Sequence, residues 1–294
     1  MRRKLKRISK LVALEFPRLG RLFGIENDGK LIRVDYGYQP RVRDANTPAY
    51  RKMHALLDAR RDVYEKTLAD IQSLTPLLAN ISNTASSDPE QPYWQNTWLP
   101  VLDGMTLYSM VALRKPRRYV EIGSGNSTKF ARRAIRDLSL ATKIISIDPT
   151  PRAEIDNICD ESIRARCEDV PNAFFEQLRP DDLLFVDNSH RSFQNSDVTV
   201  FFTEILPALP RGMIVGLHDV FLPQDYPERW TQRFYNEQYL LAAYLFGGGD
   251  GAEILLPNFF ISLDPALKEI AASLIKDCKI SDPGHPGTIF WMQR

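Results

Sequence analysis

The chain has 294 residues, of which 44% are apolar, so it can build one substantial core with an accessory region. Its formal net charge of +1 gives no reason to expect a nucleic-acid partner, and no apolar run is long enough to span a bilayer. The cysteines have neither metal-ligand spacing nor an even count, so we expect free thiols and a cytoplasmic location: Cys159, Cys167 and Cys278.

The N-terminal segment is strongly basic. Residues 1–22 contain eight Arg or Lys residues and one Glu, a net charge of +7. Apolar side chains fall on one face of a helix in this segment: Leu5, Ile8, Leu11, Val12 and Phe16. The pattern is typical of a helix on an anionic membrane surface, and equally of a solvated basic helix or a frayed end. Peripheral membrane contact through residues 1–22 is therefore a hypothesis.

A helical region follows this segment. Residues 24–46 lack periodicity, so residues 1–46 are predicted to be a basic N-terminal arm. Thr47-Pro48 is a typical helix start, and one long helix is predicted after it from an apolar stripe: Met53, Leu57, Tyr64, Leu68 and Ile71. A polar loop and an aromatic segment then lead into a second helix, which completes a helical cap region at 47–117.

Residues 118–294 alternate buried-type strands with helices. A strand at 118–122 ends in the turn Gly123-Ser-Gly125 and continues into a helix. Apolar runs at 143–148, 182–187 and 212–219, with a weaker one at 163–167, predict a parallel sheet covered by helices on both faces. The segments 253–263 and 288–293 are strand-like, with no full crossover helix expected in this final part.

Acidic residues end several predicted strands, among them Glu121, Asp148, Asp187 and Asp219. The carboxyl ends of parallel strands form the edge at which open α/β sheets bind ligands. Asp148 follows Gly123 by 25 residues, which suits an acid that accepts hydrogen bonds from both ribose hydroxyls. The sequence therefore predicts a nucleoside-like ligand at this edge.

These motifs resemble a known family. Glu121-Ile-Gly-Ser-Gly-Asn-Ser with Asp148 resembles the first two motifs of class I S-adenosylmethionine-dependent methyltransferases. Val186-Asp-Asn-Ser-His190 and Leu217-His-Asp219 resemble the subgroup with Asp-x-x-His after the fourth strand and His-Asp after the fifth. The resemblance covers residues 93–294. It implies an α/β, Rossmann-like, doubly wound sheet of seven strands, mostly parallel with an antiparallel last strand.

The resemblance also implies a cofactor site, formed by Glu121, Gly123, Gly125, Ser127, Asp148, Asp169, Val170 and Asp187. Gly123 and Gly125 would face the methionine part of S-adenosylmethionine, with Ser127 in place of the third motif glycine. Glu121 would hold the amino end of the cofactor and Asp148 the ribose. Asp169 and Val170 would border the adenine, and Asp187 would lie beside the sulfonium with His190.

Two routes to catalysis remain open. If the acceptor is a hydroxyl, His190 or His218 can take its proton, because imidazole titrates near neutral pH. Alternatively, Asp187, Asp219 and His218 can bind a divalent cation such as Mg²⁺, which would lower the pKa of the hydroxyl. Related metal-dependent enzymes use acids at such positions, although two strong oxygen ligands are few for a hard cation.

The sequence therefore predicts an S-adenosylmethionine-dependent methyltransferase that acts on oxygen of a small-molecule or glycan-like acceptor. An NAD(P)-dependent oxidoreductase is the first alternative, although Thr128 stands where its third glycine should be. A non-catalytic adapter that keeps the fold and docks on membranes or partners is the second. Residues 220–235 are rich in aromatics and predict either a lid over the acceptor or a loop packed on the body.

Overall fold

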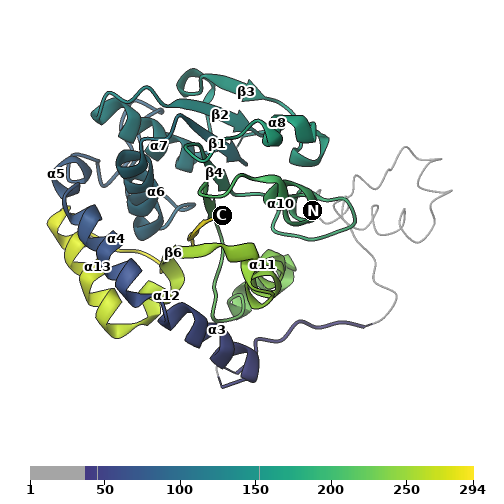
Figure 1. Cartoon of the computed structure of the whole chain (residues 1–294). Coiled ribbons are helices and arrows are strands. Elements are labelled where there is room, and N and C mark those ends of the chain that lie inside the picture. The colour runs from purple at the N-terminus through teal and green to yellow at the C-terminus, as the bar shows by residue number, and fades with distance from the viewer. Residues whose placement is uncertain (1–36, 45, 152) are drawn as a thin grey trace, which may run out of the picture. The chain divides into compact units, whose positions relative to one another are not determined.

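The computed structural model describes residues 37–44, 46–151 and 153–294 (Figure 1). The predictions for residues 1–22 lie outside these ranges. The chain divides into Met1–Arg41 and a compact unit, Val42–Arg294, that contains the elements below. Among the described helices, none combines the length and apolar character that crossing a membrane requires.

A sheet of seven strands forms the centre of the described part of this unit, in the order β3-β2-β1-β4-β5-β7-β6. Its strands are β1 (Arg118–Ile122), β2 (Lys143–Ile147), β3 (Glu161–Ile163), β4 (Leu183–Val186), β5 (Ile214–Leu217), β6 (Glu253–Pro257) and β7 (Phe290–Gln293). The first five run parallel, whereas β7 is antiparallel to both β5 and β6. The predicted Rossmann-like fold with an antiparallel last strand is confirmed.

Helices cover both faces of the sheet, which explains why its central strands are apolar on both sides. Figure 1 shows α6 and α7 on one side and α8, α10 and α11 on the other. The described helices are α3 (Pro48–Asp58), α4 (Arg61–Gln72), α5 (Thr75–Leu78), α6 (Val101–Arg114), α7 (Asn126–Asp137), α8 (Asn172–Glu176), α9 (Asp197–Val200), α10 (Leu206–Ala208), α11 (Glu237–Phe246), α12 (Asn258–Leu263) and α13 (Pro265–Asp277). A π-helical segment, Phe201–Ile205, joins α9 to α10.

The long helix predicted after Thr47 is two helices. Thr47 caps α3 as expected, since its side chain accepts a hydrogen bond from the Tyr50 N–H. The chain leaves helical geometry at Arg60, with φ −120° and ψ 21°, and α4 begins at the next residue. Both pieces bury apolar side chains, Leu57 in α3 and Tyr64 in α4.

Two strand predictions near the ends of the sheet have wrong bounds, and the strand expected at 253–263 is β6, which ends at Pro257. Residues 258–263 form α12, and α13 stands between β6 and β7, where no crossover helix was expected. Asp264 caps α13 by accepting from two backbone N–H groups, and Pro265 occupies its first position. This is the same cap-and-proline start that Thr47-Pro48 provides. The weak strand expected at 163–167 lies earlier, at Glu161–Ile163.

Candidate active site

A cavity of about 610 Å³ opens at the carboxyl ends of β1, β2 and β4. Five of the predicted cofactor residues line it together: Gly123, Gly125, Ser127, Asp148 and Asp187. Glu121, Asp169 and Val170 are not among its lining residues, and Arg166, Cys167 and Glu168 line the part predicted for Asp169 and Val170. Tyr93, Trp98 and Leu99 from the aromatic segment complete one wall. The position matches the edge at which doubly wound sheets bind ligands.

The two loop glycines are required for different reasons. Gly123 has φ +78°, and a Cβ there would lie 1.8 Å from the carbonyl oxygen of Asp187. It therefore allows the chain leaving β1 to pass against the end of β4. A Cβ on Gly125 would meet no protein atom within 4 Å. Because Gly125 lines the cavity, its missing side chain leaves room for a ligand.

Asp148 is held in place by two backbone groups. Its Oδ2 accepts from the Ser124 N–H at 2.8 Å and its Oδ1 from the Thr150 N–H at 2.7 Å. These bonds tie the end of β2 to the glycine loop. Each carboxylate oxygen keeps a second lone pair, so Asp148 can still accept hydrogen bonds from a ligand in the cavity.

Glu121 lies fully buried at the end of β1. Its Oε2 accepts from the Thr128 hydroxyl at 2.5 Å, and the same hydroxyl oxygen accepts from the Gly125 N–H at 3.1 Å. Its Oε1 is buried without a hydrogen-bond partner in the described structure. Burial raises the pKa of Glu121 to about 8. A buried acceptor of this kind, linked to the glycine loop, fits a cationic donor such as an ammonium group.

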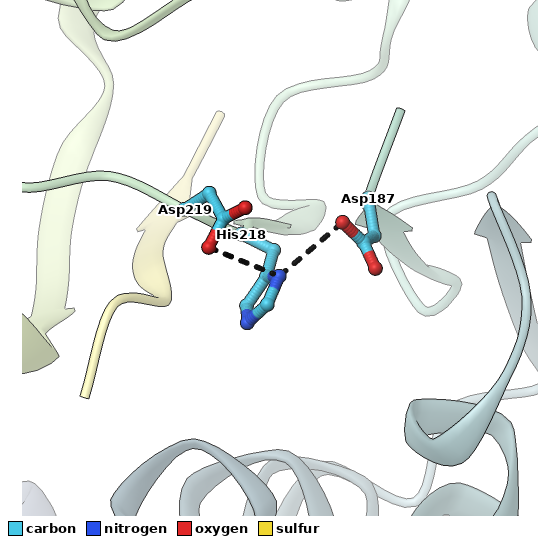
Figure 2. Close-up of side chains that lie close together, drawn as sticks. All are labelled: Asp187, His218 and Asp219. Carbon is cyan, nitrogen blue, oxygen red and sulfur yellow. Dashed lines mark hydrogen bonds and ion pairs between the residues drawn. The ribbon is translucent and has the colours of Figure 1, made fainter. Parts of the chain in front are cut away.

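A second group of side chains adjoins the cavity where β4 and β5 end. Asp187, His218 and Asp219 each offer a donor atom, and these atoms all lie within 4.8 Å of one another. Figure 2 shows His218 Nδ1 directed toward both carboxylates, at 3.2 Å from Asp187 Oδ1 and 3.7 Å from Asp219 Oδ1. Asp187 belongs both to this group and to the cavity wall. The proposed metal ligands are therefore brought together beside the predicted cofactor pocket.

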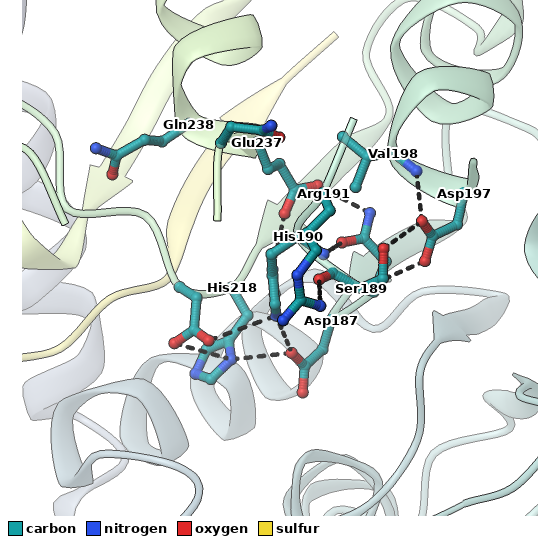
Figure 3. Close-up of polar contacts among 12 residues, drawn as sticks. Asp187, Ser189, His190, Arg191, Asp197, Val198, His218, Glu237 and Gln238 are labelled. Carbon is teal, nitrogen blue, oxygen red and sulfur yellow. Dashed lines mark hydrogen bonds and ion pairs between the residues drawn. The ribbon is translucent and has the colours of Figure 1, made fainter. Parts of the chain in front are cut away.

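His190 extends this group (Figure 3). Its Nε2 lies 3.1 Å from Asp187 Oδ1 and 3.4 Å from Asp219 Oδ2. Its Nδ1 lies 2.9 Å from Glu237 Oε2, and the Asn188 amide donates to the other oxygen of Glu237 at 2.9 Å. His190 and Glu237 are both buried, so the imidazole is fixed from two sides.

A buried carboxylate also stands behind His218. Asp103 Oδ2 lies 3.6 Å from His218 Nε2, a nitrogen that is buried and makes no hydrogen bond. Asp103 itself accepts from the Thr288 and Ile289 N–H groups just before β7 and from the Asn258 amide. These bonds hold the first turn of α6 against α12 and the residues that lead into β7.

Residues 120–220 match a family model described as "Methyltransferase domain". The match contains the glycine loop, Asp148 and the side-chain group at the ends of β4 and β5. The matched segment is a methyltransferase domain, and the enzyme is an S-adenosylmethionine-dependent methyltransferase. This assignment favours methyl transfer over the oxidoreductase and the non-catalytic adapter. No curated protein matches the chain.

Among solved structures, the chain is similar to several methyltransferases at low identity and low TM-score. The SAH-bound methyltransferase PaMTH1 of Podospora anserina is 15% identical, with a TM-score of 0.41, over 77% of this chain and 86% of that one. The plantazolicin methyltransferase BpumL in complex with SAH is 11% identical, with a TM-score of 0.39, over 85% and 91%. Coclaurine N-methyltransferase is 10% identical, with a TM-score of 0.33, over 84% and 94%. Likeness at this level carries no argument about the acceptor.

The imidazoles of the methyltransferase are surrounded by acids. Burial opposes the charged form, but bonds to Asp187 and Glu237 raise the pKa of His190 well above its ordinary value. For His218, burial is likewise outweighed by the charges of Asp219 and Asp187, which raise its pKa. With these partners, both imidazoles hold their protons at neutral pH. The prediction that one of them takes a proton from an acceptor hydroxyl stays a prediction.

The aromatic segment after β5 packs mainly on the body of the methyltransferase. Phe221 and Tyr226 are buried against Phe259, and Trp230 and Tyr235 pack on this cluster while partly exposed. The centroid of the Tyr235 ring lies 4.7 Å from the centroid of the His190 ring. The segment thus combines a packed base with two partly exposed rings, one of which contacts His190.

Two residues of the site, Asp103 and Glu237, were not predicted from the sequence. Asp103 lies in the first turn of α6 and Glu237 in the first turn of α11. An acid at such a position is usually a solvated partner of the helix dipole, and no motif sets these two apart. Only the packing of both helices against the sheet brings them to the histidines.

Proposed function

We propose that the methyltransferase transfers a methyl group to a hydroxyl oxygen of a small-molecule or glycan-like acceptor. We infer that it belongs to the subgroup with Asp-x-x-His after the fourth strand and His-Asp after the fifth. The observation that carries the proposal is the group Asp187, His218 and Asp219 at the edge of the cofactor cavity. A site that combines a cofactor pocket with adjoining carboxylates suits an acceptor that must lose a proton.

The residues of the cavity fit S-adenosylmethionine. When bound, this cofactor supplies a methyl group on a positively charged sulfur. Gly125 leaves space for its methionine part, and the unpartnered Oε1 of Glu121 offers an acceptor for the amino group. Asp148 is held by Ser124 and Thr150 in a position to accept from the ribose hydroxyls. Asp187 would place a negative charge near the sulfonium.

The group beyond Asp187 fits a divalent cation. Two carboxylates and one imidazole nitrogen within 4.8 Å form a credible donor set. A bound ion would lower the pKa of an acceptor hydroxyl. The raised pKa of His190 and His218 disfavours the neutral nitrogen that a base needs, whereas an ion that binds the imidazole of His218 would displace its proton. The ion is therefore the more economical source of deprotonation.

Calorimetric titration with S-adenosylmethionine and with NADH tests the cofactor. We expect micromolar or tighter binding of the first and none of the second. Phenols, catechols and sugars are then offered as acceptors, and release of S-adenosylhomocysteine is measured with and without chelator. Turnover that requires a hydroxyl and stops with chelator supports the proposal. Turnover on amines alone would contradict oxygen transfer, and turnover unaffected by thorough chelation would contradict the cation.

A further inference from the structure

The cation site proposed above has one nitrogen donor, His218, yet a second imidazole faces the same carboxylates. His190 Nε2 lies 3.1 Å from Asp187 Oδ1 and 3.4 Å from Asp219 Oδ2. The matching distances from His218 Nδ1 are 3.2 Å and 3.7 Å. Neighbouring donors around an ion with bonds of ~2.1 Å are ~3.0–3.4 Å apart. Both imidazoles are therefore near ligand spacing from the two carboxylates.

Each imidazole has a buried carboxylate behind it. Glu237 binds the remote nitrogen of His190 at 2.9 Å, and the Asn188 amide fixes Glu237 as an acceptor. Asp103 stands 3.6 Å from the remote nitrogen of His218. A carboxylate in this position is the usual partner of a metal-ligating histidine, because it sets the tautomer and directs the other lone pair at the ion. The pattern occurs twice here, with Glu237 behind His190 and Asp103 behind His218.

The backbone of this site is also strained. His190 has φ 60° and Asp219 has φ 57°, both in the left-handed region. Such conformations are unfavourable in residues other than glycine, and they collect at functional sites. The surrounding fold therefore holds two of the four facing residues, His190 and Asp219, in unfavourable backbone conformations. An incidental ion pair would not require such conformations.

We propose that His190 is a fourth ligand of the cation, together with Asp187, His218 and Asp219, and that this set prefers a first-row transition metal to Mg²⁺. The inference rests on the proposed function, because it specifies the ion of that site. Imidazole nitrogen suits Zn²⁺, Co²⁺ and Fe²⁺, whereas Mg²⁺ takes oxygen ligands and keeps several waters. Binding would release the proton that each imidazole otherwise shares with the carboxylates.

The test uses the full-length protein after chelation and titrates it separately with Co²⁺, Zn²⁺ and Mg²⁺ by calorimetry. We expect Co²⁺ and Zn²⁺ to bind at least ~100-fold more tightly than Mg²⁺. Proton NMR of the Co²⁺-loaded protein in water should contain two exchangeable, paramagnetically shifted N–H signals. One comes from His190 Nδ1–H, held by Glu237, and the other from His218 Nε2–H, facing Asp103. This readout counts ligating imidazoles without reference to turnover.

Variants connect the signals to residues. His190→Gln and His190→Ala should each lose one shifted signal and weaken Co²⁺ binding by more than ~100-fold. Glu237→Gln should weaken it by ~10–100-fold, the usual effect of losing an outer partner. His54→Ala is the matched control, because His54 lies on α3 and packs against Phe260. It should keep both signals. Circular dichroism identifies any variant that fails to fold, and the glutamine variant keeps a polar group of similar size.

The outcomes separate this inference from the proposed function. A single shifted signal in the wild type, or His190→Gln binding Co²⁺ as tightly as His54→Ala, would overturn the ligand role and leave the cation site standing. Mg²⁺ binding as tight as Co²⁺ would refute the metal preference. Failure of the wild type to bind any of the three ions would remove the cation altogether. S-adenosylmethionine affinity, measured in parallel, decides separately whether the cofactor site is correct.

Discussion

Glu121 provides a sharp test. Burial of its carboxyl group should lower the free energy of unfolding as pH rises, and the same group is proposed to bind the cofactor. Its pKa is raised by burial from 4.5 to about 8. An acid with a raised pKa favours folding at low pH, and that contribution disappears as pH rises through the folded pKa. At ~1.4 kcal/mol per pH unit, the loss between about pH 4.5 and 8 amounts to ~5 kcal/mol. Glu121→Gln has no such titration.

The expected result is a melting temperature that depends less on pH in the variant. Between about pH 5.5 and 8, the wild type should lose ~3 kcal/mol relative to Glu121→Gln, or roughly 6–12 °C at ~2–4 °C per kcal/mol. The glutamine carbonyl can still accept from Thr128, so that hydrogen bond is preserved. Glu161→Gln, an exposed acid on β3, controls for the loss of one charge.

The same variant should bind S-adenosylmethionine more weakly, by ~10–100-fold, because an ammonium group loses its carboxylate partner. Thermal melts of the cofactor-free protein across this pH range and calorimetry with the cofactor test both parts. A melting-temperature difference that does not change with pH would refute the raised pKa. Equal cofactor affinity in both proteins would refute the contact with the amino group.

Other predictions concern the loops and the N-terminus. Gly123→Ala should lower the melting temperature because its Cβ would lie 1.8 Å from a backbone oxygen, whereas Gly125→Ala should keep it and lose cofactor affinity; equal melting temperatures would contradict this assignment. Asp148→Ala should abolish cofactor binding and cost ~1–3 kcal/mol, since two N–H groups lose their acceptor, and unchanged affinity by calorimetry would remove its ribose role. Tyr226→Ala should destabilise by ~3–5 kcal/mol because Tyr226 is buried. Trp230→Ala should instead raise the acceptor KM at unchanged cofactor affinity, and a parallel loss of both would mean that the segment only packs. Deleting residues 1–22, which carry a net charge of +7, should reduce sedimentation with anionic vesicles, whereas equal sedimentation would dispose of membrane contact.

The sequence alone was sufficient for the central strands and for the edge of the sheet at which the cavity opens. Apolar runs with β-branched residues predict the parallel strands, because strands covered on both faces must be apolar throughout. Gly123, Gly125, Asp148 and Asp187 line one cavity because each follows a strand, and the carboxyl ends of parallel strands meet at one edge. In this case, the position of a residue in the sequence, directly after a strand, predicts its position in space, since the sheet brings the ends of distant strands together.

Only the tertiary structure showed which carboxylates contact the remote nitrogens of His190 and His218, and which helices precede the last strand. Asp103 and Glu237 reach His218 and His190 from helices, and the contact depends on how α6 and α11 pack, which no local pattern encodes. The break at Arg60 likewise has no strong local breaker. The structural requirement for glycine also comes from tertiary structure. Only the position of the Asp187 carbonyl oxygen explains why residue 123 cannot carry a Cβ. Local sequence specifies strands and turns through short-range sterics, whereas a buried polar network depends on packing between segments far apart in the chain.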